Sequence, residues 1–469
     1  MGLFVFTERG KMKAWELEYK IRKSIKPDPN YKPVWDIDSG FSEDNILRMK
    51  WESFVPGSGA IEHLIVGAVQ SVENMGRDVT EAEKLLEIGF KVFENSDFGQ
   101  LKLITKEMFE NLERAPLIKG HKYYTFRRPT EWEEISKEFP ETSYPMQGDS
   151  MLFDRIYAGW LGQIAGASMG TRLEGFTSKA LQEVFGESLG KYIYKPSTLN
   201  DDITYEIAFI SAFKDKKRSI DSEFLSKKWV ELIPFGWSAE LVALENLKKG
   251  ILPPLSGIKL NPFQEWIGAQ MRCMVHGFLS PYNPSEAARL AFIDSQISHS
   301  GNGIYGGIHS AVLVSLAFLV DEPIRLVTES LKYIPEHTEF QEVLEKTINW
   351  CRNAKSYEEV IPLIEDEFKQ YNWVHLYPNA ACVITSLWFS NGIFDKAMKI
   401  VAQAGFDVDC NAGEVGSIIG VMKGMNALSD YWIKPFNDNL ETYVRGFENI
   451  KISELTELTV KLLKETECL

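Results

Sequence analysis

The sequence predicts an all-α protein, and three observations lead to this fold class. Apolar residues recur in blocks of helical length, and few stretches alternate apolar with polar residues as strands do. Residues 158–170 are crowded with glycine and alanine, which lets a helix approach its neighbours closely. No internal repeat or low-complexity tract is visible, so a solenoid is disfavoured. We therefore expect an α-helical bundle.

The expected helices of this bundle follow one another after residue 150. Besides the small-residue helix, the apolar runs that fit buried or half-buried helices are 207–213, 286–297, 310–320, 380–389 and 415–422. The longest mainly apolar run, 311–320, is about half of the ~20 residues that a transmembrane helix needs. We therefore interpret it as a buried helix.

The length of the chain and changes of composition along it predict the domain organisation. A chain of 469 residues is too long for one small domain. Before residue 150 it is rich in charge and tryptophan, with two amphipathic helices expected at 42–54 and 79–93. The segment 140–150, PETSYPMQGDS, has the composition of a boundary. We predict a mostly helical N-terminal extension or cap domain of unknown role, 1–148, and a main domain, 149–469.

Composition excludes several classes of function. Hydrophobic residues make up 44% and charged residues 25%, as in ordinary globular proteins. The net charge of -15 opposes binding to nucleic acid or to an anionic membrane. Five cysteines without CxxC spacing indicate neither a disulfide framework nor a zinc knuckle, and the first residues, MGLFVFTERGK, do not form a signal peptide. We expect a cytoplasmic protein.

Two acidic turns carry the chemistry. Asn200, Asp201 and Asp202 precede an apolar run, where they act either as a plain N-cap or as oxygen ligands of a hard cation such as Mg²⁺. Asp407 and Asp409 sit one residue apart before a second small-residue helix, and the same two interpretations apply. Two such turns in one helical protein favour a shared cluster, which would be repulsive without a cation. Together they indicate a metal site.

Five blocks of sequence, taken in order, resemble the ADP-ribosylglycohydrolase family. The texts NPFQEWIGAQMR and SHSGNGIYGG are similar to a bacterial subgroup of that family, and residues before about 150 have no counterpart in it. The blocks are Asp154-Arg155-Ile156 with Gly159, Gly162, Gly166, Gly170 and Glu174; Asn200-Asp201-Asp202; 267–272; 298–306; and 407–411.

The resemblance implies an orthogonal all-α bundle that holds two Mg²⁺ ions and hydrolyses the N- or O-glycosidic bond at C1″ of an ADP-ribosyl group, releasing ADP-ribose. Glu174 matches a glutamate on a mobile flap that guards or polarises the reacting centre. Glu174, Asp201 and Asp409 are the candidate catalytic residues, and spacing does not choose among them as general base. The implied metal ligands are Asn200, Asp201, Asp202, Asp407 and Asp409.

The resemblance also implies a substrate pocket. Backbone amides of a phosphate loop would hold the diphosphate, which explains how an acidic protein could bind ADP-ribose. The implied loop residues are Gly268, Ala269, Gln270 and Met271, and those that shape the ribose and phosphate pocket are His299, Ser300, Asn302, Gly303 and Tyr305. The expected partner is an ADP-ribosylated protein or a small ADP-ribosyl or ribosyl compound.

Two departures from the family pattern concern the metals. Cys410 stands where many members have threonine, and a thiol is a poor ligand for Mg²⁺, so either water or a carbonyl replaces this ligand or a softer ion such as Mn²⁺ is tolerated. Ile203 stands at another threonine position and cannot ligate, whereas the amide oxygen of Asn200 can. Two alternatives stay open: a hydrolase of a smaller riboside or nucleotide, and a non-enzymatic structural or binding homologue. The retained carboxylates argue against the second.

Overall fold

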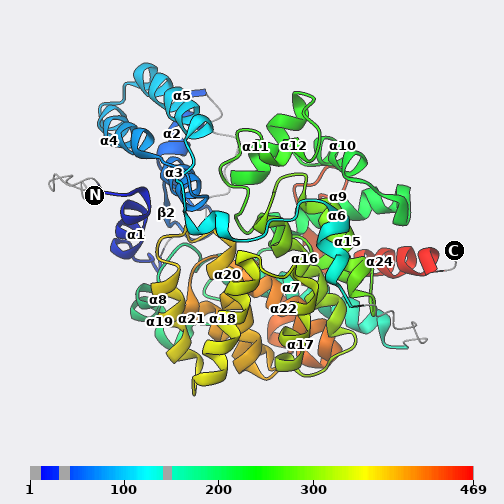
Figure 1. Cartoon of the computed structure of the whole chain (residues 1–469). Coiled ribbons are helices and arrows are strands. Elements are labelled where there is room, and N and C mark those ends of the chain that lie inside the picture. Colours follow the sequence, from blue (N-terminus) through cyan, green and yellow to red (C-terminus); the bar gives the residue numbers. More distant parts are fainter. Residues whose placement is uncertain (1–11, 31–42, 141–149, 468–469) are drawn as a thin grey trace.

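The computed structural model describes residues 12–30, 43–140 and 150–467 and confirms the all-α fold class. Its described part contains 24 α-helices and two small antiparallel two-stranded sheets (Figure 1). The predicted boundary at 140–150 lies almost wholly outside the described residues, as do the first eleven residues. None of the described helices is long and apolar enough to cross a membrane.

The helices before residue 115 build most of a second hydrophobic core, which Ala239, Phe263 and Trp266 of the larger bundle complete, and we call residues 12–30 and 43–115 the N-terminal unit. At its centre Trp51 is fully buried and donates from Nε1 to Thr105 Oγ1 at 2.8 Å. The unit comprises α1 (Ala14–Ser24), α2 (Glu43–Trp51), β1 (Ser53–Phe54), β2 (Ile61–Glu62), α3 (Leu64–Asn74), α4 (Thr80–Glu94) and α5 (Phe98–Arg114).

The two helices predicted in this region both exist. The prediction for 79–93 corresponds to α4, but the one for 42–54 is wrong at its end, because the last residues leave α2 and pair as β1 with β2. Tertiary pairing decides this end, since Ser53 lies opposite Glu62 in an antiparallel register that amphipathic spacing does not report.

A strap of residues 116–140 leaves the N-terminal unit and runs across the larger bundle (cyan in Figure 1). It contains η1 (Lys122–Thr125), α6 (Trp132–Ile135) and η2 (Ser136–Glu138). Trp132 packs on Phe292 with ring centroids 5.6 Å apart, and Tyr305 donates its hydroxyl to the backbone oxygen of Pro129 at 2.6 Å. The strap therefore belongs physically to the bundle.

The remaining helices and strands form the larger bundle and pack around one large hydrophobic core. Its longer helices are α7 (Leu152–Gly170), α8 (Ser178–Phe185), α9 (Asp201–Lys216), α10 (Ser222–Leu232), α11 (Ser238–Lys248), α15 (Pro284–Ser295), α16 (Asn302–Ala317), α17 (Pro323–Ser330), α18 (Glu339–Asn353), α19 (Tyr357–Glu367), α20 (Leu376–Ser390), α21 (Phe394–Ala404), α22 (Val408–Lys423) and α24 (Ile452–Glu467). Its short elements are η3 (Gly186–Ser188), η4 (Lys217–Ser219), α12 (Leu255–Ile258), α13 (Gly268–Met271), α14 (Met274–Phe278), η5 (Leu331–Tyr333), η6 (Gly424–Ala427), α23 (Asp430–Ile433), η7 (Lys434–Phe436), β3 (Asn439–Glu441) and β4 (Asn449–Lys451).

Every apolar run predicted after residue 150 lies in a helix, although the bounds differ. The run 310–320 is the clearest case: α16 begins at Asn302 and ends at Ala317. Its first turns contain Gly306, which packs on Leu376, and Gly307, which packs on Ser295. Glycines that make room for neighbouring helices weaken a hydrophobic pattern, so the apolar pattern did not predict the first two turns of this helix.

The small-residue helix α7 packs closely against α22. Gly162 faces the backbone of Gly416, Gly166 faces the carbonyl of Ala412, and Gly170 faces the backbone of Asp409. Since the numbers fall along α22 as they rise along α7, the two helices are antiparallel. This packing brings the end of α7, and the loop that follows it, to the beginning of α22.

A candidate metal centre between two helix starts

The first acidic turn begins α9. Asn200 is the N-cap, and its side-chain oxygen accepts from the backbone N–H of Asp202 at 2.8 Å. Asp202 is fully buried, whereas Asp201 has part of its surface exposed to solvent although its carboxyl group lies among the other acidic side chains. The capping interpretation is therefore correct for Asn200, and it leaves both carboxylates available for other contacts.

The second acidic turn begins α22 and is fixed by a buried asparagine of α20. Asp407 donates its backbone N–H to Asn379 Oδ1 at 3.1 Å, and Asn411 Nδ2 donates to the same oxygen at 2.8 Å. Phe406, just before the turn, has a φ of 63°, in the left-handed region that is uncommon for a bulky residue. The surrounding contacts hold this strained turn in place.

The two turns meet although about 200 residues separate them. Asn200 Nδ2 donates to Asp409 Oδ2 at 3.2 Å, and Cys410 Sγ donates to Asp202 Oδ1 at 3.3 Å. One potential ligand atom from each of Asp407, Asp409 and Cys410 lies within 4.8 Å of the others. We call Asp201, Asp202, Asp407 and Asp409 the acidic cluster.

Burial and mutual repulsion disfavour charge in the acidic cluster. Desolvation first, and then the charge of Asp409, raise the pKa values of Asp202 and Asp407 well above the ordinary range. The same two causes raise the pKa of Asp201 to about 6. Among the described residues, no lysine, arginine or histidine forms an ion pair with these carboxylates. The cluster thus lacks a positive charge of its own.

The free oxygens of the cluster fit a hard divalent cation. Asp202 Oδ2, Asp407 Oδ1 and Asp409 Oδ1 are buried and have no hydrogen-bond partner in the described protein. Carboxylate oxygens are the ligands that Mg²⁺ prefers, and a cation would relieve both the repulsion and the missing hydrogen bonds.

Cys410 contributes a neutral thiol rather than a thiolate. Burial first, and then the charge of Asp202, raise the pKa of this thiol well above its usual value. The protonated thiol donates to Asp202, and Sγ also lies 3.8 Å from Met271 Sδ. Ile203 is buried in the core. Cys410 therefore orients a carboxylate of the cluster through its proton.

Glu174 lies beside the cluster because α7 and α22 are antiparallel. It is half-buried in the loop after α7, where Gly175 donates its backbone N–H to the Phe406 oxygen at 2.9 Å. Burial first, then Asp409, Asp407 and Asp201, raise the pKa of Glu174 well above the ordinary value. This shift favours the neutral carboxyl group, which can donate a hydrogen bond.

A family model for ADP-ribosylglycohydrolases matches residues 149–467, which is more than half of the chain. The chain belongs to the ADP-ribosylglycohydrolase family. A solved structure described as "ADP-ribosylglycohydrolase-related protein complex" is similar over 67% of this chain and 99% of that chain, with 17% sequence identity and a TM-score of 0.49. A comparison with curated proteins found no match. Membership indicates a hydrolase of the ADP-ribosylglycohydrolase type, with an ADP-ribosyl substrate in general terms.

The segment that corresponds to the family's phosphate loop forms the short helix α13. All four of its residues are buried, Gly268 packs against Glu240, and Gln270 Nε2 donates to Glu414 Oε2 at 2.6 Å. Ala269 is fully buried, and Met271 reaches Cys410. Met271 links this segment to the acidic cluster, while phosphate binding by its amides stays a prediction.

The second predicted pocket block forms the turn that starts α16, and its side chains make internal hydrogen bonds. His299 Nδ1 lies 2.7 Å from Ser298 Oγ, and burial, followed by the charge of Arg272, lowers the pKa of His299 well below its ordinary value. The remaining members are Ser300, which donates to Gln264; Asn302, which donates to Glu265 at 3.0 Å; Gly303, which packs under the Gln264 oxygen; and Tyr305, bonded to the strap. Contact with a ribose stays a prediction for this block.

Sequence reasoning missed two residues of the site. Asn379 orients the second acidic turn, and Gly57 of the N-terminal unit lies against the Glu174 loop. A single asparagine inside an apolar run has no recognisable pattern. Gly57 precedes the family domain and stands alone, so no sequence signal marks either residue.

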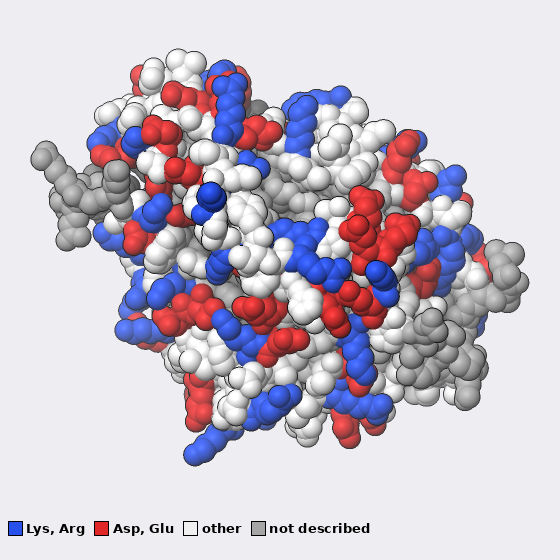
Figure 2. All heavy atoms as spheres, viewed as in Figure 1, with Lys and Arg blue, Asp and Glu red and all other residues white. Residues whose placement is uncertain are grey.

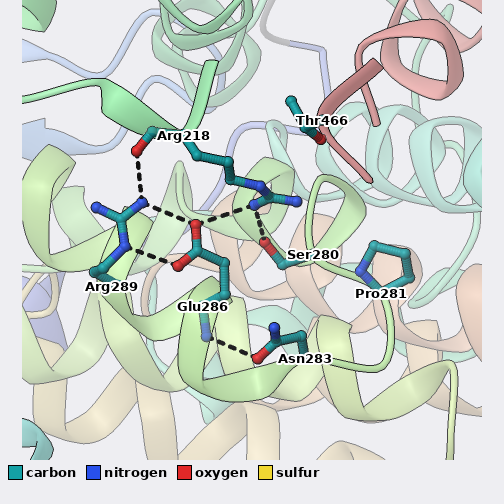
Figure 3. Close-up of a pocket in the computed structure, with 7 residues that line it drawn as sticks. All are labelled: Arg218, Ser280, Pro281, Asn283, Glu286, Arg289 and Thr466. Carbon is teal, nitrogen blue, oxygen red and sulfur yellow. Dashed lines mark hydrogen bonds and ion pairs between the residues drawn. The ribbon is translucent and has the colours of Figure 1, made fainter. Parts of the chain in front are cut away.

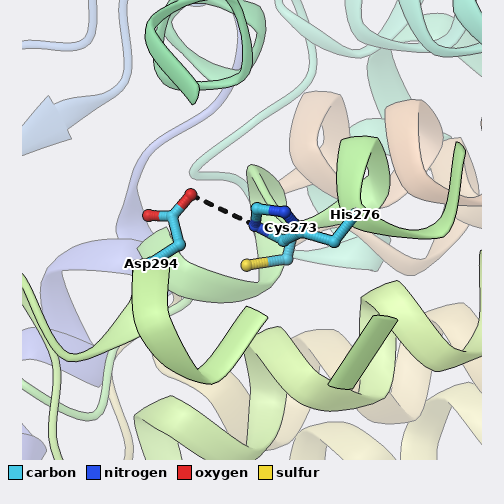
Figure 4. A group of neighbouring side chains, drawn as sticks. All are labelled: Cys273, His276 and Asp294. Atoms are coloured by element: carbon cyan, nitrogen blue, oxygen red, sulfur yellow. Dashed lines mark hydrogen bonds and ion pairs between the residues drawn. The ribbon is translucent and has the colours of Figure 1, made fainter. Parts of the chain in front are cut away.

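A second group of metal-binding residue types is better explained as an ion-pair network. Cys273, His276 and Asp294 come together in the core (Figure 4), with His276 Nε2 3.2 Å from Asp294 Oδ2. Arg272 already pairs with Asp294 at 2.9 Å and with Glu240 at 2.8 Å. Because an arginine balances these carboxylates, this group has no need of a cation.

On the described surface that Figures 2 and 3 show, no group of residues has chemistry comparable to that of the acidic cluster. On the face in Figure 2, lysine and arginine alternate with aspartate and glutamate and form no broad basic patch. In the hollow of Figure 3, Arg218 and Arg289 both pair with Glu286, at 3.2 Å and 2.7 Å. None of the residues that line this hollow belongs to the acidic cluster.

Proposed function

We propose that this chain is a metal-dependent glycohydrolase that cleaves the glycosidic bond at C1″ of an ADP-ribosyl group and releases ADP-ribose. One observation carries the proposal: two acidic turns from distant parts of the chain converge, and three of their buried carboxylate oxygens have neither a hydrogen-bond partner nor a paired cation among the residues that the structure describes. Asp201, Asp202, Asp407 and Asp409 would hold two Mg²⁺ ions, with Mn²⁺ tolerated, and Asn200 would join them only through the amide oxygen that also caps α9. The compartment proposed is the cytoplasm.

The carboxyl groups of the chain would have different roles in the reaction, according to their exposure to solvent. When bound, the ions would supply Lewis-acid polarisation and fixed positions for the ribose hydroxyls. Asp201 is the member of the cluster that reaches the solvent, so its carboxylate would accept a proton from an attacking water. Glu174, half-buried beside Asp409, would guard or polarise the C1″ centre. Nearby carboxylates and the ribose hydroxyls that the ions align would stabilise an oxocarbenium-like transition state.

Product analysis tests the proposal. Purified protein is incubated with ADP-ribosyl-arginine, ADP-ribosyl-serine and a set of nucleosides, with Mg²⁺ or with a chelator, and the products are separated by chromatography. Asp409→Asn removes a charge from the cluster, and Asp221→Asn is its matched control, because Asp221 is the N-cap of α10 and asparagine caps equally well.

We expect free ADP-ribose from the wild type and from Asp221→Asn with Mg²⁺, a loss of about 100-fold or more in Asp409→Asn, and no product with chelator. Cleavage of nucleosides alone would replace this proposal with the smaller-riboside function. Release of ADP-ribose that is unaffected by both the chelator and Asp409→Asn would show that the cluster is not the catalytic centre.

A further inference from the structure

The N-terminal unit, which lies outside the matched family domain, touches the loop that carries Glu174. A Cβ atom at Gly57 would lie 2.5 Å from the backbone oxygen of Thr171, closer still to the Thr171 methyl group, and 3.0 Å from Glu174 Oε1. Only a glycine leaves room for this approach, because the atoms opposite it include backbone. Gly57 therefore sits directly against the loop.

A buried arginine of the same loop binds two separate segments of the N-terminal unit. Arg172 is 5% exposed, donates from Nη1 to the Gly57 oxygen at 3.3 Å, and donates from Nη2 to the Asp28 oxygen at 3.2 Å. The planar guanidinium fork suits two acceptors in fixed directions. The loop is thus tied to the unit by hydrogen bonds as well as by packing.

The unit also reaches the second acidic turn. Arg22 of α1 is held by Glu18 at 3.0 Å and lies over the ring of Phe406, with its guanidinium carbon 5.2 Å from the ring centroid. Phe406 immediately precedes Asp407 and accepts the backbone hydrogen bond of Gly175. One unit therefore contacts both loops that place carboxyl groups in the site.

The seam between the unit and the bundle is nearly filled. A Cβ at Gly175 would lie 2.7 Å from Ala60 Cβ of the unit. The hollow beside it, lined in part by Glu62 and Trp373, has a volume of about 20 Å³, which holds a water molecule but not a ribose. The seam thus joins two packed surfaces rather than forming a ligand pocket.

We propose that the N-terminal unit is a positioning element of the active site: Gly57, Arg172 and Arg22 hold the Glu174 loop and the Phe406 turn in register above the acidic cluster. This inference rests on the proposed function, because it assigns the unit a role in that same reaction. The unit lies outside the matched family domain, which begins at residue 149, and its contacts would fix the position of the loop. It is therefore required for turnover.

The test compares two glycines of the same unit. Gly57→Ala introduces a methyl group against the Thr171 backbone, and Gly99→Ala places one where the closest atom, Asp97 Oδ1, is 3.6 Å away. Hydrogen exchange measured by mass spectrometry over residues 171–178 reports the loop, and exchange in α3 to α5 reports folding of the unit. Steady-state hydrolysis gives kcat and KM for whichever ADP-ribosyl substrate the wild type cleaves.

We expect loop exchange about tenfold faster in Gly57→Ala, kcat lower by about 100-fold with KM changed by less than about threefold, and exchange in α3 to α5 like that of the wild type. Gly99→Ala should match the wild type throughout. Arg172→Lys should show an intermediate loss of kcat, because lysine keeps the charge but lacks the two-way fork.

Equal loop exchange in Gly57→Ala and Gly99→Ala would overturn the proposal, and so would an unchanged kcat despite faster exchange. Failure of the underlying function looks different. If the wild type cleaves no ADP-ribosyl substrate while Gly57→Ala still loosens the loop, the glycohydrolase assignment fails, and with it the requirement for turnover, although the contact itself is real.

Discussion

A methyl group added to Gly416 tests the close approach of α22 to α7. A Cβ there would lie 2.8 Å from the carbonyl carbon of Gly162, whereas two carbon atoms pack at about 3.5–4.0 Å. Both sides of this contact are backbone, so the helices themselves must separate by roughly 1 Å.

The expected cost follows from two opposing effects. Overpacking lowers the free energy of unfolding by up to about 3 kcal/mol, and replacing a helical glycine with alanine raises it by about 1 kcal/mol. Gly416→Ala should therefore destabilise the fold by about 2 kcal/mol. For a domain spanning residues 149–467, that corresponds to a melting temperature about 3 °C lower.

Gly413→Ala on the same helix is the matched control. A Cβ at Gly413 would have its nearest neighbours at 3.5 Å, an ordinary contact, so the helix-propensity gain should raise the melting temperature by about 1 °C. Calorimetry in Mg²⁺-free buffer compares the two variants with the wild type. Equal stability of the two variants would refute the close antiparallel packing on which the placement of Glu174 depends.

Three further predictions concern charge and thiols. Mg²⁺ should raise the melting temperature more as the pH rises through about 6, where Asp201 ionises. The raised carboxyl pKa values destabilise the metal-free fold increasingly above the unfolded pKa near 4, and metal binding releases these protons. An increase in melting temperature that does not depend on pH would contradict the cation site. Arg272→Met should cost about 3–5 kcal/mol in denaturant unfolding, since it leaves Glu240 and Asp294 buried without their partner; a loss below about 1 kcal/mol would show that the network is not essential. In the folded protein a thiol reagent should not modify the four cysteines that the structure shows buried, and rapid labelling of all of them before unfolding would contradict their burial; they are Cys273, Cys351, Cys382 and Cys410.

The elements that could be predicted from sequence are those whose signal is local. Both acidic turns lie at helix starts as expected: Asn200 caps α9 with its side chain, a contact between residues within three positions, whereas Asp407 begins α22 without a side-chain cap. The small-residue helix is α7, and its glycines do face a neighbouring backbone. Helix ends were less predictable: β1 and the first turns of α16 depend on what packs against them, which local periodicity does not record.

The sequence by itself determined the fold class, the family and the identity of the carboxylates, because apolar spacing and short motifs depend only on residues close together in the chain. Only the tertiary structure decided that α22 is the partner of α7, that Asn200 meets Asp409, and that Gly57 lies against the Glu174 loop. These contacts join residues more than a hundred positions apart. Their formation depends on which surfaces fit each other after the chain has folded, and no local pattern encodes that fit.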